Sequence, residues 1–360
     1  MDFDRGYFYY TVKQYDTIYK LANEFGTTVT RIIVANPNID IYNLVIGMQI
    51  LIPVGNIVKT NTNYNSNILR RNVNDLKLVY PFLEIGEIGK SVLGKPLIYI
   101  RIGRGNREVF YNGAFHANEW ITTPVLMKFI EEYSKAFVNN TTIYGYHSRA
   151  LFYTTSLYVV PMVNPDGVDL VTGSIKDVEN AYKKAQKIAN NFSDIPFPSG
   201  WKANINGVDL NLQFPAGWEN AKEIKYSQGF NQPAPRDFVG EGPLTEPESV
   251  AIYNFTLNHN FRIVIAYHTQ GEEIYWKFQN FNPPMSEYIG RQFAISSGYV
   301  LADTPYNSSF AGYKDWFIQE YNRPGYTIEA GLGENPLPIS QFDNIYEKNI
   351  WILVLGMINS

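Results

Sequence analysis

Long apolar runs that recur between helical stretches constrain the fold of this chain more than any other feature. Residues 156–163 read Ser-Leu-Tyr-Val-Val-Pro-Met-Val, and residues 261–268 read Phe-Arg-Ile-Val-Ile-Ala-Tyr-His. Runs with so little polar alternation are typical of strands that are buried on both faces of a sheet. Further segments are strand-like at 97–103 and 109–114 and helical at 69–80, 124–137, 177–191 and 246–258. This alternation predicts an α/β domain over residues 68–360.

Composition bounds the size of the protein and excludes some classes of function. With 360 residues, 45% of them hydrophobic, the chain can form one large domain and a small one. Its formal net charge of -4 gives no general attraction to nucleic acid or to an anionic membrane, and we expect neither as a partner. The chain has no cysteine, which excludes disulfides, thiolate zinc sites and cysteine nucleophiles.

The four histidines differ in their surroundings. His268 ends a buried run, at the place where open α/β sheets hold their ligands. His116 follows the strand-like segment 109–114 closely. His147 and His259 lie in polar stretches, and we expect both to be ordinary surface residues.

His116 and Glu119 form a His-x-x-Glu pair whose side chains can point to one place in a turn or a first helical turn. Zinc accepts an imidazole nitrogen and a carboxylate oxygen, and a hydrolytic zinc takes three protein ligands and leaves one position for water. Because this pair supplies only two ligands, the third must come from elsewhere in the chain. A bare His-x-x-Glu is more often a surface histidine and a solvated glutamate at a helix start.

In two further segments, polar residues directly follow an apolar run. Asn164-Pro165-Asp166-Gly167 follows a buried run and predicts a turn. Residues 326–331 read Tyr-Thr-Ile-Glu-Ala-Gly, which predicts a short strand with Glu329 at its end.

Residues 7–54 form a compact module with a predicted strand, two helices and a closing strand. The strands are expected at 9–12 and 49–53 and the helices at 18–25 and 29–35, the first capped by Asp16-Thr17. The pattern Tyr-x-Val-x-x-x-Asp-Thr-Ile, then Asn36-Pro37, then Gly47–Pro53 resembles a LysM domain. That resemblance implies a βααβ fold that binds the N-acetylglucosamine backbone of peptidoglycan or chitin. The positions that match the family's sugar-contacting loops are Asp16, Thr17, Ile18, Pro37 and Ile39.

The alternative for this module is a small accessory domain without affinity for sugars. Residues 55–67, which include Asn61-Thr62-Asn63-Tyr64-Asn65, are polar and are expected to form a linker or exposed connector.

The rest of the chain resembles the zinc carboxypeptidases of the carboxypeptidase A type. The resemblance rests on four motifs in the family's order: His116-x-x-Glu119-Trp120, Asn164–Gly167, His268 after a β-branched run, and Thr327-Ile328-Glu329. It implies a mixed, about eight-stranded sheet with helices on both faces, and one Zn²⁺ per chain. By the same resemblance His116, Glu119 and His268 are the metal ligands, and Glu329 is the general base that takes the proton of the attacking water.

The same resemblance suggests the residues that contact the substrate. Trp201-Lys202 stands where the family has an arginine near the developing oxyanion, so Lys202 is expected to supply that charge. Tyr306 lies near the position of the family's mobile tyrosine. Asn211 is followed by Leu212, where members that remove C-terminal residues have an arginine that clamps the terminal carboxylate. Arg236 and Lys314 are candidates for the missing cation.

Within the family, four segments resemble the bacterial γ-D-glutamyl-L-diamino acid endopeptidases, which cut peptidoglycan stem peptides. These segments are 211–218, 234–237, 314–316 and 333–336. A LysM module fits the same polymer. The alternatives are a carboxypeptidase that trims peptide C-termini, and a wall-binding protein that has lost its activity. Intact His116, Glu119, His268 and Glu329 argue against the second.

The location of the protein is expected from two features. Residues 1–5 lack the basic and apolar parts of a secretory signal, and no run is apolar enough to span a bilayer. We therefore expect the protein in the bacterial cytoplasm or spore, or in the cell wall after release. A role in sporulation rests on analogy with the family.

Overall fold

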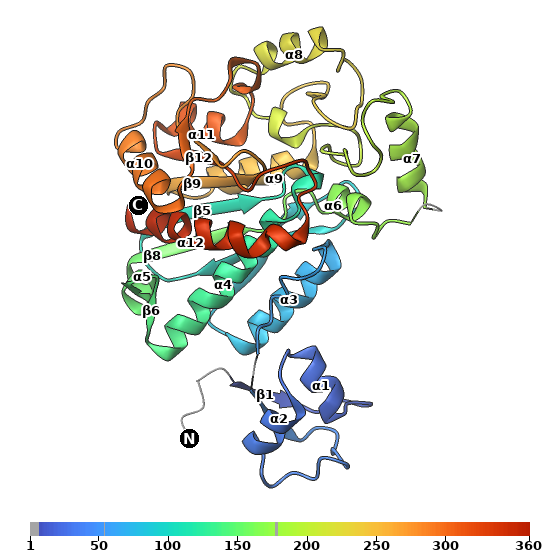
Figure 1. The fold of residues 1–360 in the computed structure, drawn as a ribbon, viewed down its shortest axis with the longest axis vertical. Coiled ribbons are helices and arrows are strands. Elements are labelled where there is room, and N and C mark those ends of the chain that lie inside the picture. The colour runs from blue at the N-terminus through green and yellow to red at the C-terminus, as the bar shows by residue number, and fades with distance from the viewer. Residues whose placement is uncertain (1–6, 54, 177–178) are drawn as a thin grey trace.

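The structure, a computed structural model, describes residues 7–53, 55–176 and 179–360 and shows a small N-terminal unit beside a large one (Figure 1). The small unit consists of β1 (Tyr7–Thr11), α1 (Ile18–Glu24), α2 (Val29–Ala35) and β2 (Gln49–Pro53). β1 and β2 pair in antiparallel fashion. The Thr17 hydroxyl caps α1 by accepting a hydrogen bond from the backbone N–H of Lys20. The predicted βααβ order is confirmed.

In the large unit, eight strands form one mixed sheet among the described residues. Their order across the sheet is β11 (Val300–Ala302), β10 (Glu273–Tyr275), β12 (Gly325–Glu329), β9 (Phe261–His268), β5 (Arg107–Gly113), β8 (Thr155–Val160), β4 (Pro96–Ile102) and β3 (Glu84–Lys90). The central strands β12, β9, β5 and β8 run parallel. β4 pairs antiparallel to β8, and β3 antiparallel to β4. The sheet predicted from the family resemblance is confirmed.

Helices cover both faces of this sheet, because the side chains of its central strands alternate between two cores. Val109 and Tyr111 of β5 belong to one core, and Phe110 belongs to the other. The first core is covered by α3 (Ser66–Val79), α4 (Thr122–Asn139), α10 (Ser286–Ser297) and α12 (Phe342–Ile358), and the second by α9 (Pro247–Leu257) and α11 (Tyr313–Tyr321). In the described part of the chain, no helix is both long and apolar enough to cross a membrane.

Shorter elements complete the large unit. They are α5 (Ser148–Thr154), α6 (Pro165–Val171), α7 (Asn180–Ala189), α8 (Trp218–Ser227), the hairpin β6 (Thr142–Ile143) and β7 (Tyr146–His147), and the 3₁₀ turns η1 (Ala117–Glu119), η2 (Leu210–Leu212), η3 (Tyr306–Ser308) and η4 (Ile339–Gln341). The predicted helix 177–191 corresponds to α7, and residues 177–178 lie outside the described residues.

The expected exposed connector at 55–67 is wrong in part. Ile57 and Val58 are buried, and their backbone N–H groups donate to the carboxylate of Glu131 on α4. Tyr64 is fully buried and donates its hydroxyl hydrogen to Asn72 on α3. The segment is polar on average, but it contains three apolar or aromatic side chains that pack on the large unit.

Two other expectations need correction. Asn164–Gly167 is the first turn of α6, because the Asn164 side chain accepts a hydrogen bond from the Gly167 N–H and Pro165 takes the first helical position. Turns and helix starts use the same residue types, so the sequence did not separate them. His259 is half-buried, with its ring stacked on Phe261 at 4.9 Å, whereas His147 is exposed as expected.

Candidate metal centre and substrate cavity

Two adjacent parallel strands bring the predicted metal ligands together at the carboxyl end of the sheet. Gly113, the last residue of β5, pairs with Tyr267 of β9, so that the chain leaving β5 passes beside His268. That chain turns at once into η1, which carries Glu119 three residues after His116. On the other side of β9, Glu329 is the register partner of His268. Sites at the carboxyl ends of parallel strands follow from this topology.

The three ligand side chains converge on one point. The His116 Nδ1 lies 2.9 Å from Glu119 Oε1, and the His268 Nδ1 lies 2.9 Å from Glu119 Oε2. The two Nδ1 atoms are 3.2 Å apart. Ligands ~2.1 Å from a zinc ion at tetrahedral angles stand ~3.4 Å from one another, so the donor set and its spacing fit Zn²⁺. All three side chains are buried.

Two charged residues contact this triad. Asp209 accepts a hydrogen bond from the His116 Nε2 at 3.1 Å, which fixes the ring with its Nδ1 toward the metal position. Burial opposes the ionised form of Asp209, but His116, Lys202 and Lys225 together outweigh burial and hold the pKa of Asp209 below its ordinary value. Lys202 lies 3.1 Å from Glu119. Burial likewise opposes the charged form of Lys202, but Glu119 raises the pKa of Lys202 above its usual range.

Glu329 differs from the other acids of the site. Burial and, next, the Glu119 carboxylate raise the pKa of Glu329 to about 8. A carboxyl group with a raised pKa both accepts and returns a proton near neutral pH, which is what a general base and acid requires.

The comparisons with known proteins agree with this geometry. The sequence profile described as "Zinc carboxypeptidase" matches residues 70–351, and that of the "LysM domain" matches residues 10–53. The chain belongs to the zinc carboxypeptidase family. Together with the converging His116, Glu119 and His268, this membership identifies a zinc-dependent peptidase.

Three relatives illustrate the likeness. "Gamma-D-glutamyl-L-diamino acid endopeptidase 1" of Lysinibacillus sphaericus is 46% identical over 84% of this chain and 74% of its own length. "Uncharacterized protein YqgT" of Bacillus subtilis (strain 168) is 42% identical over 81% of this chain and 76% of its own. The structure of bovine thrombin-activatable fibrinolysis inhibitor shares the fold, with a TM-score of 0.64, 18% identity, and coverage of 83% of this chain and 98% of that one.

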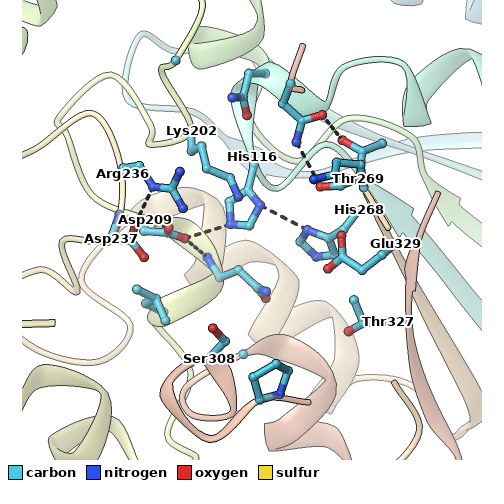
Figure 2. Close-up of a pocket in the computed structure, with 18 of the residues that line it drawn as sticks. His116, Lys202, Asp209, Arg236, Asp237, His268, Thr269, Ser308, Thr327 and Glu329 are labelled. Carbon is cyan, nitrogen blue, oxygen red and sulfur yellow. Dashed lines mark hydrogen bonds and ion pairs between the residues drawn. The ribbon is translucent and has the colours of Figure 1, made fainter. Parts of the chain in front are cut away.

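A cavity of about 620 Å³ opens beside the zinc carboxypeptidase triad (Figure 2). Most of the residues singled out in the sequence line it: His116, Lys202, Asn211, Leu212, Arg236, His268, Lys314 and Glu329. Tyr306 is not among the lining residues. Its side chain is 62% exposed and its ring packs edge-on against Phe310, so the structure does not bring it to the site.

Some charged residues of this site are not among those predicted from the sequence. Asp209 stands two residues before Asn211, and an acid inside the otherwise apolar stretch Val208-Asp209-Leu210 was the signal that could have revealed it. Lys225 on α8 and Asp237 form an ion pair of 2.6 Å at the cavity wall. Nothing in the sequence marks Lys225 as a site residue, because it lies in an ordinary amphipathic helix.

The LysM positions expected to contact sugar divide into two groups. The Asp16 carboxylate accepts hydrogen bonds from the Tyr10 hydroxyl and the Lys13 N–H, and Ile18, the first residue of α1, is buried. The Ile18 side chain packs in the core of the unit, so a contact of this position with a glycan would involve its backbone. Pro37 is exposed and Ile39 half-buried, so both remain accessible to a ligand.

Proposed function

We propose that this peptidase hydrolyses the bond between the γ-carboxyl of D-glutamate and the diamino acid in peptidoglycan stem peptides, and that its LysM unit holds it on the glycan. One structural observation carries the endopeptidase part. Leu212 forms part of the cavity wall next to Asn211, where it offers no hydrogen bond to a terminal carboxylate. The cavity wall at this position therefore suits a chain that continues past the cleaved bond. The printed name of the Lysinibacillus sphaericus relative supports the choice of bond.

The residues of the site have distinct roles in this proposal. His116, Glu119 and His268 would hold the zinc, which when bound would act as a Lewis acid toward the attacking water and the scissile carbonyl. Glu329 accepts the proton of the attacking water at its carboxylate and returns it to the leaving nitrogen. Lys202 donates a hydrogen bond to the carbonyl oxygen as negative charge develops there.

Asn211 and its neighbours orient the substrate. The Asn211 Oδ1 accepts a hydrogen bond from the backbone N–H of Tyr313, which leaves the Nδ2 as the side chain's donor toward the cavity. The Asp209 carboxylate accepts from the backbone N–H of Asn211 and so fixes η2 beside His116.

The LysM unit places this activity on the cell wall. We infer that Thr17, Pro37 and Ile39 lie at the glycan-binding loops and that the Asp16 segment contributes through its backbone. The protein acts on peptidoglycan in a bacterial cell wall or spore, and a sporulation role extends the same analogy.

The second candidate is removal of C-terminal residues from ordinary peptides, which the family description favours. Two defined substrates separate the candidates: the stem tetrapeptide L-Ala-γ-D-Glu-diamino acid-D-Ala, in which the chain continues past the γ-D-glutamyl bond, and an L-tripeptide with a free C-terminus. We expect release of L-Ala-D-Glu from the first and little trimming of the second. Rapid trimming of the L-peptide with the stem peptide untouched would establish the carboxypeptidase instead.

A matched pair of variants sharpens this experiment. Leu212→Arg introduces a carboxylate clamp and should raise activity on the C-terminally free L-peptide, whereas Leu212→Met keeps the apolar surface and should not. If Leu212→Met raised that activity as much as Leu212→Arg, the carboxylate argument would be wrong.

A further inference from the structure

Four cationic side chains line the cavity among the described residues, and they differ in how far they are already engaged. They are Lys202, Lys225, Arg236 and Lys314. A substrate carboxylate binds where a cation keeps donors free, because an ammonium or guanidinium whose donors are all used offers little to a ligand.

Lys314 is the most fully engaged of the four. Its side chain is 3% exposed, and its Nζ contacts Asp315 at 2.7 Å, the carbonyl oxygen of Lys277 at 2.8 Å and the hydroxyl of Thr304 at 3.4 Å. The contacts with Lys277 and Thr304 are hydrogen bonds, and the contact with Asp315 is an ion pair. Asp315 also neutralises the charge of Lys314. We therefore expect Lys314 to stabilise the cavity wall rather than to bind a substrate carboxylate.

Each of the two other lysines also forms an ion pair. Lys225 pairs with Asp237 at 2.6 Å and is 10% exposed. Lys202 pairs with Glu119 at 3.1 Å, beside the metal position.

Arg236 is arranged differently. Only its Nε donates, to Asp237, and the described residues provide no partner for its two terminal NH₂ groups. Because Lys225 shares Asp237, the group of three charges keeps a net charge of +1. The side chain is 45% exposed and its guanidinium points toward His116 and Lys202 (Figure 2). The carbonyl oxygen of Pro235 accepts from the N–H groups of Lys202 and Ala203, which holds the backbone before Arg236 beside Lys202.

The proposed substrate carries a matching group. When glutamate is linked through its γ-carboxyl, its α-carboxylate stays free on the acyl side of the scissile bond, a few bonds from the carbonyl that reacts. An ordinary peptide has no carboxylate there. Arg236 lies on the Lys202 side of the site (Figure 2), and Lys202 is the residue that we propose to donate to that carbonyl.

We propose that the Arg236 guanidinium, held at its Nε by Asp237, binds the free α-carboxylate of the γ-linked glutamyl residue and so selects γ-glutamyl bonds over ordinary peptide bonds. This inference rests on the proposed endopeptidase activity and adds the residue that recognises its acyl side. A stem peptide whose α-carboxylate is converted to an amide loses this charge-assisted pair and becomes a poor substrate.

The test compares two stem tetrapeptides that differ only in an α-carboxylate or an α-amide on the D-glutamyl residue. The wild type should cleave the carboxylate form with a kcat/KM at least ~10-fold higher, since hydrogen bonds between charged groups are about twice as strong as neutral ones. Arg236→Gln should bring this ratio near one, and Arg236→Lys should give an intermediate ratio. Arg291→Gln, which removes an exposed cation from α10 that pairs with Glu287, should leave the ratio unchanged.

Product binding gives a second readout that does not depend on turnover. By calorimetry, L-Ala-D-Glu should bind the wild type more tightly than its α-amide analogue, and Arg236→Gln should abolish the difference. Equal cleavage of both tetrapeptides by the wild type would overturn the role of Arg236 and leave the proposed function standing. Cleavage of neither would contradict the proposed function and this inference with it.

Discussion

At the scale of single residues, the carboxyl group of Glu329 carries the proton transfers of the proposed reaction. Glu329→Gln keeps the size of the side chain and the three metal ligands but cannot accept a proton. We expect normal zinc content and a kcat at least ~100-fold lower, since general base catalysis supplies about that much or more. Glu287→Gln on α10 is the control. Turnover near the wild-type rate in Glu329→Gln would show that Glu329 is structural.

Glu248 on α9 gives a prediction about pH and stability. It is fully buried and accepts from the N–H of Val92 and the amide of Asn204, yet burial raises its pKa from 4.5 to about 7. Between these two pH values the folded state keeps a proton on Glu248 that the unfolded state releases. The protonated carboxyl group therefore contributes its full stability below pH 4.5, and this contribution is lost as the pH rises to about 7.

Glu248→Gln mimics the protonated form and should remove this dependence. Relative to the variant, the wild type should lose on the order of 1–3 kcal/mol of unfolding free energy between an acidic and a neutral buffer. Urea unfolding of both proteins at each pH measures the difference. Parallel losses in the two proteins would contradict the assignment.

Several site residues could be recognised from the sequence and others could not. His116, Glu119, His268 and Glu329 stand at strand ends in a recognisable order, and the structure gathers them. Arg236 and Lys314 each pair with the acid that follows them, and they differ through more distant residues: Lys277 also accepts from Lys314, whereas Lys225 shares the acid that holds Arg236. The sequence therefore left the two cations as equal candidates.

At the scale of elements, α4 holds the segment that enters the large unit. Glu131, 3% exposed, accepts from the N–H groups of Ile57 and Val58 and from Lys128. Glu131→Ala leaves two buried donors without an acceptor and should lower the unfolding free energy by about 2–4 kcal/mol. Lys135→Ala, an exposed change on the same helix, is the control. Equal stability of the two variants by urea unfolding would disprove the role of Glu131.

In the eight-stranded sheet, the strands that the sequence predicted are the inner ones, from β12 to β4. Residues 261–268 were placed with their true bounds, because a strand covered on both faces is a continuous apolar run. β3 reads Glu-Ile-Gly-Glu-Ile-Gly-Lys at the sheet edge, and β10 and β11 have three residues each. Such short or polar edge strands are formed by pairing with their neighbours rather than by a pattern of their own.

At the scale of the whole molecule, the LysM unit and the cavity lie toward opposite ends of the long axis. The LysM unit lies beyond α3 at one end, whereas α8 and α11, which flank the cavity, lie toward the other (Figure 1). We therefore expect the LysM unit to concentrate the enzyme on the wall and to contribute little to the chemistry.

Removal of the LysM unit tests this division. A chain that starts at Gly55 keeps the contacts of Ile57 and Val58 with Glu131. It should sediment less with intact peptidoglycan but cleave a soluble stem peptide at the rate of the full chain, because tethering acts through effective concentration. Equal sedimentation of the two proteins would reject the targeting role.

Mass spectrometry of muropeptides digested with the purified protein tests whether this enzyme cleaves the γ-D-glutamyl bond with zinc. The wild type should release L-Ala-D-Glu together with a fragment that begins with the diamino acid. His268→Ala, which lacks one metal ligand, should release neither and should hold less zinc by elemental analysis. Loss of only the C-terminal residue from the stem peptides, or an unchanged digest by His268→Ala, would contradict the account.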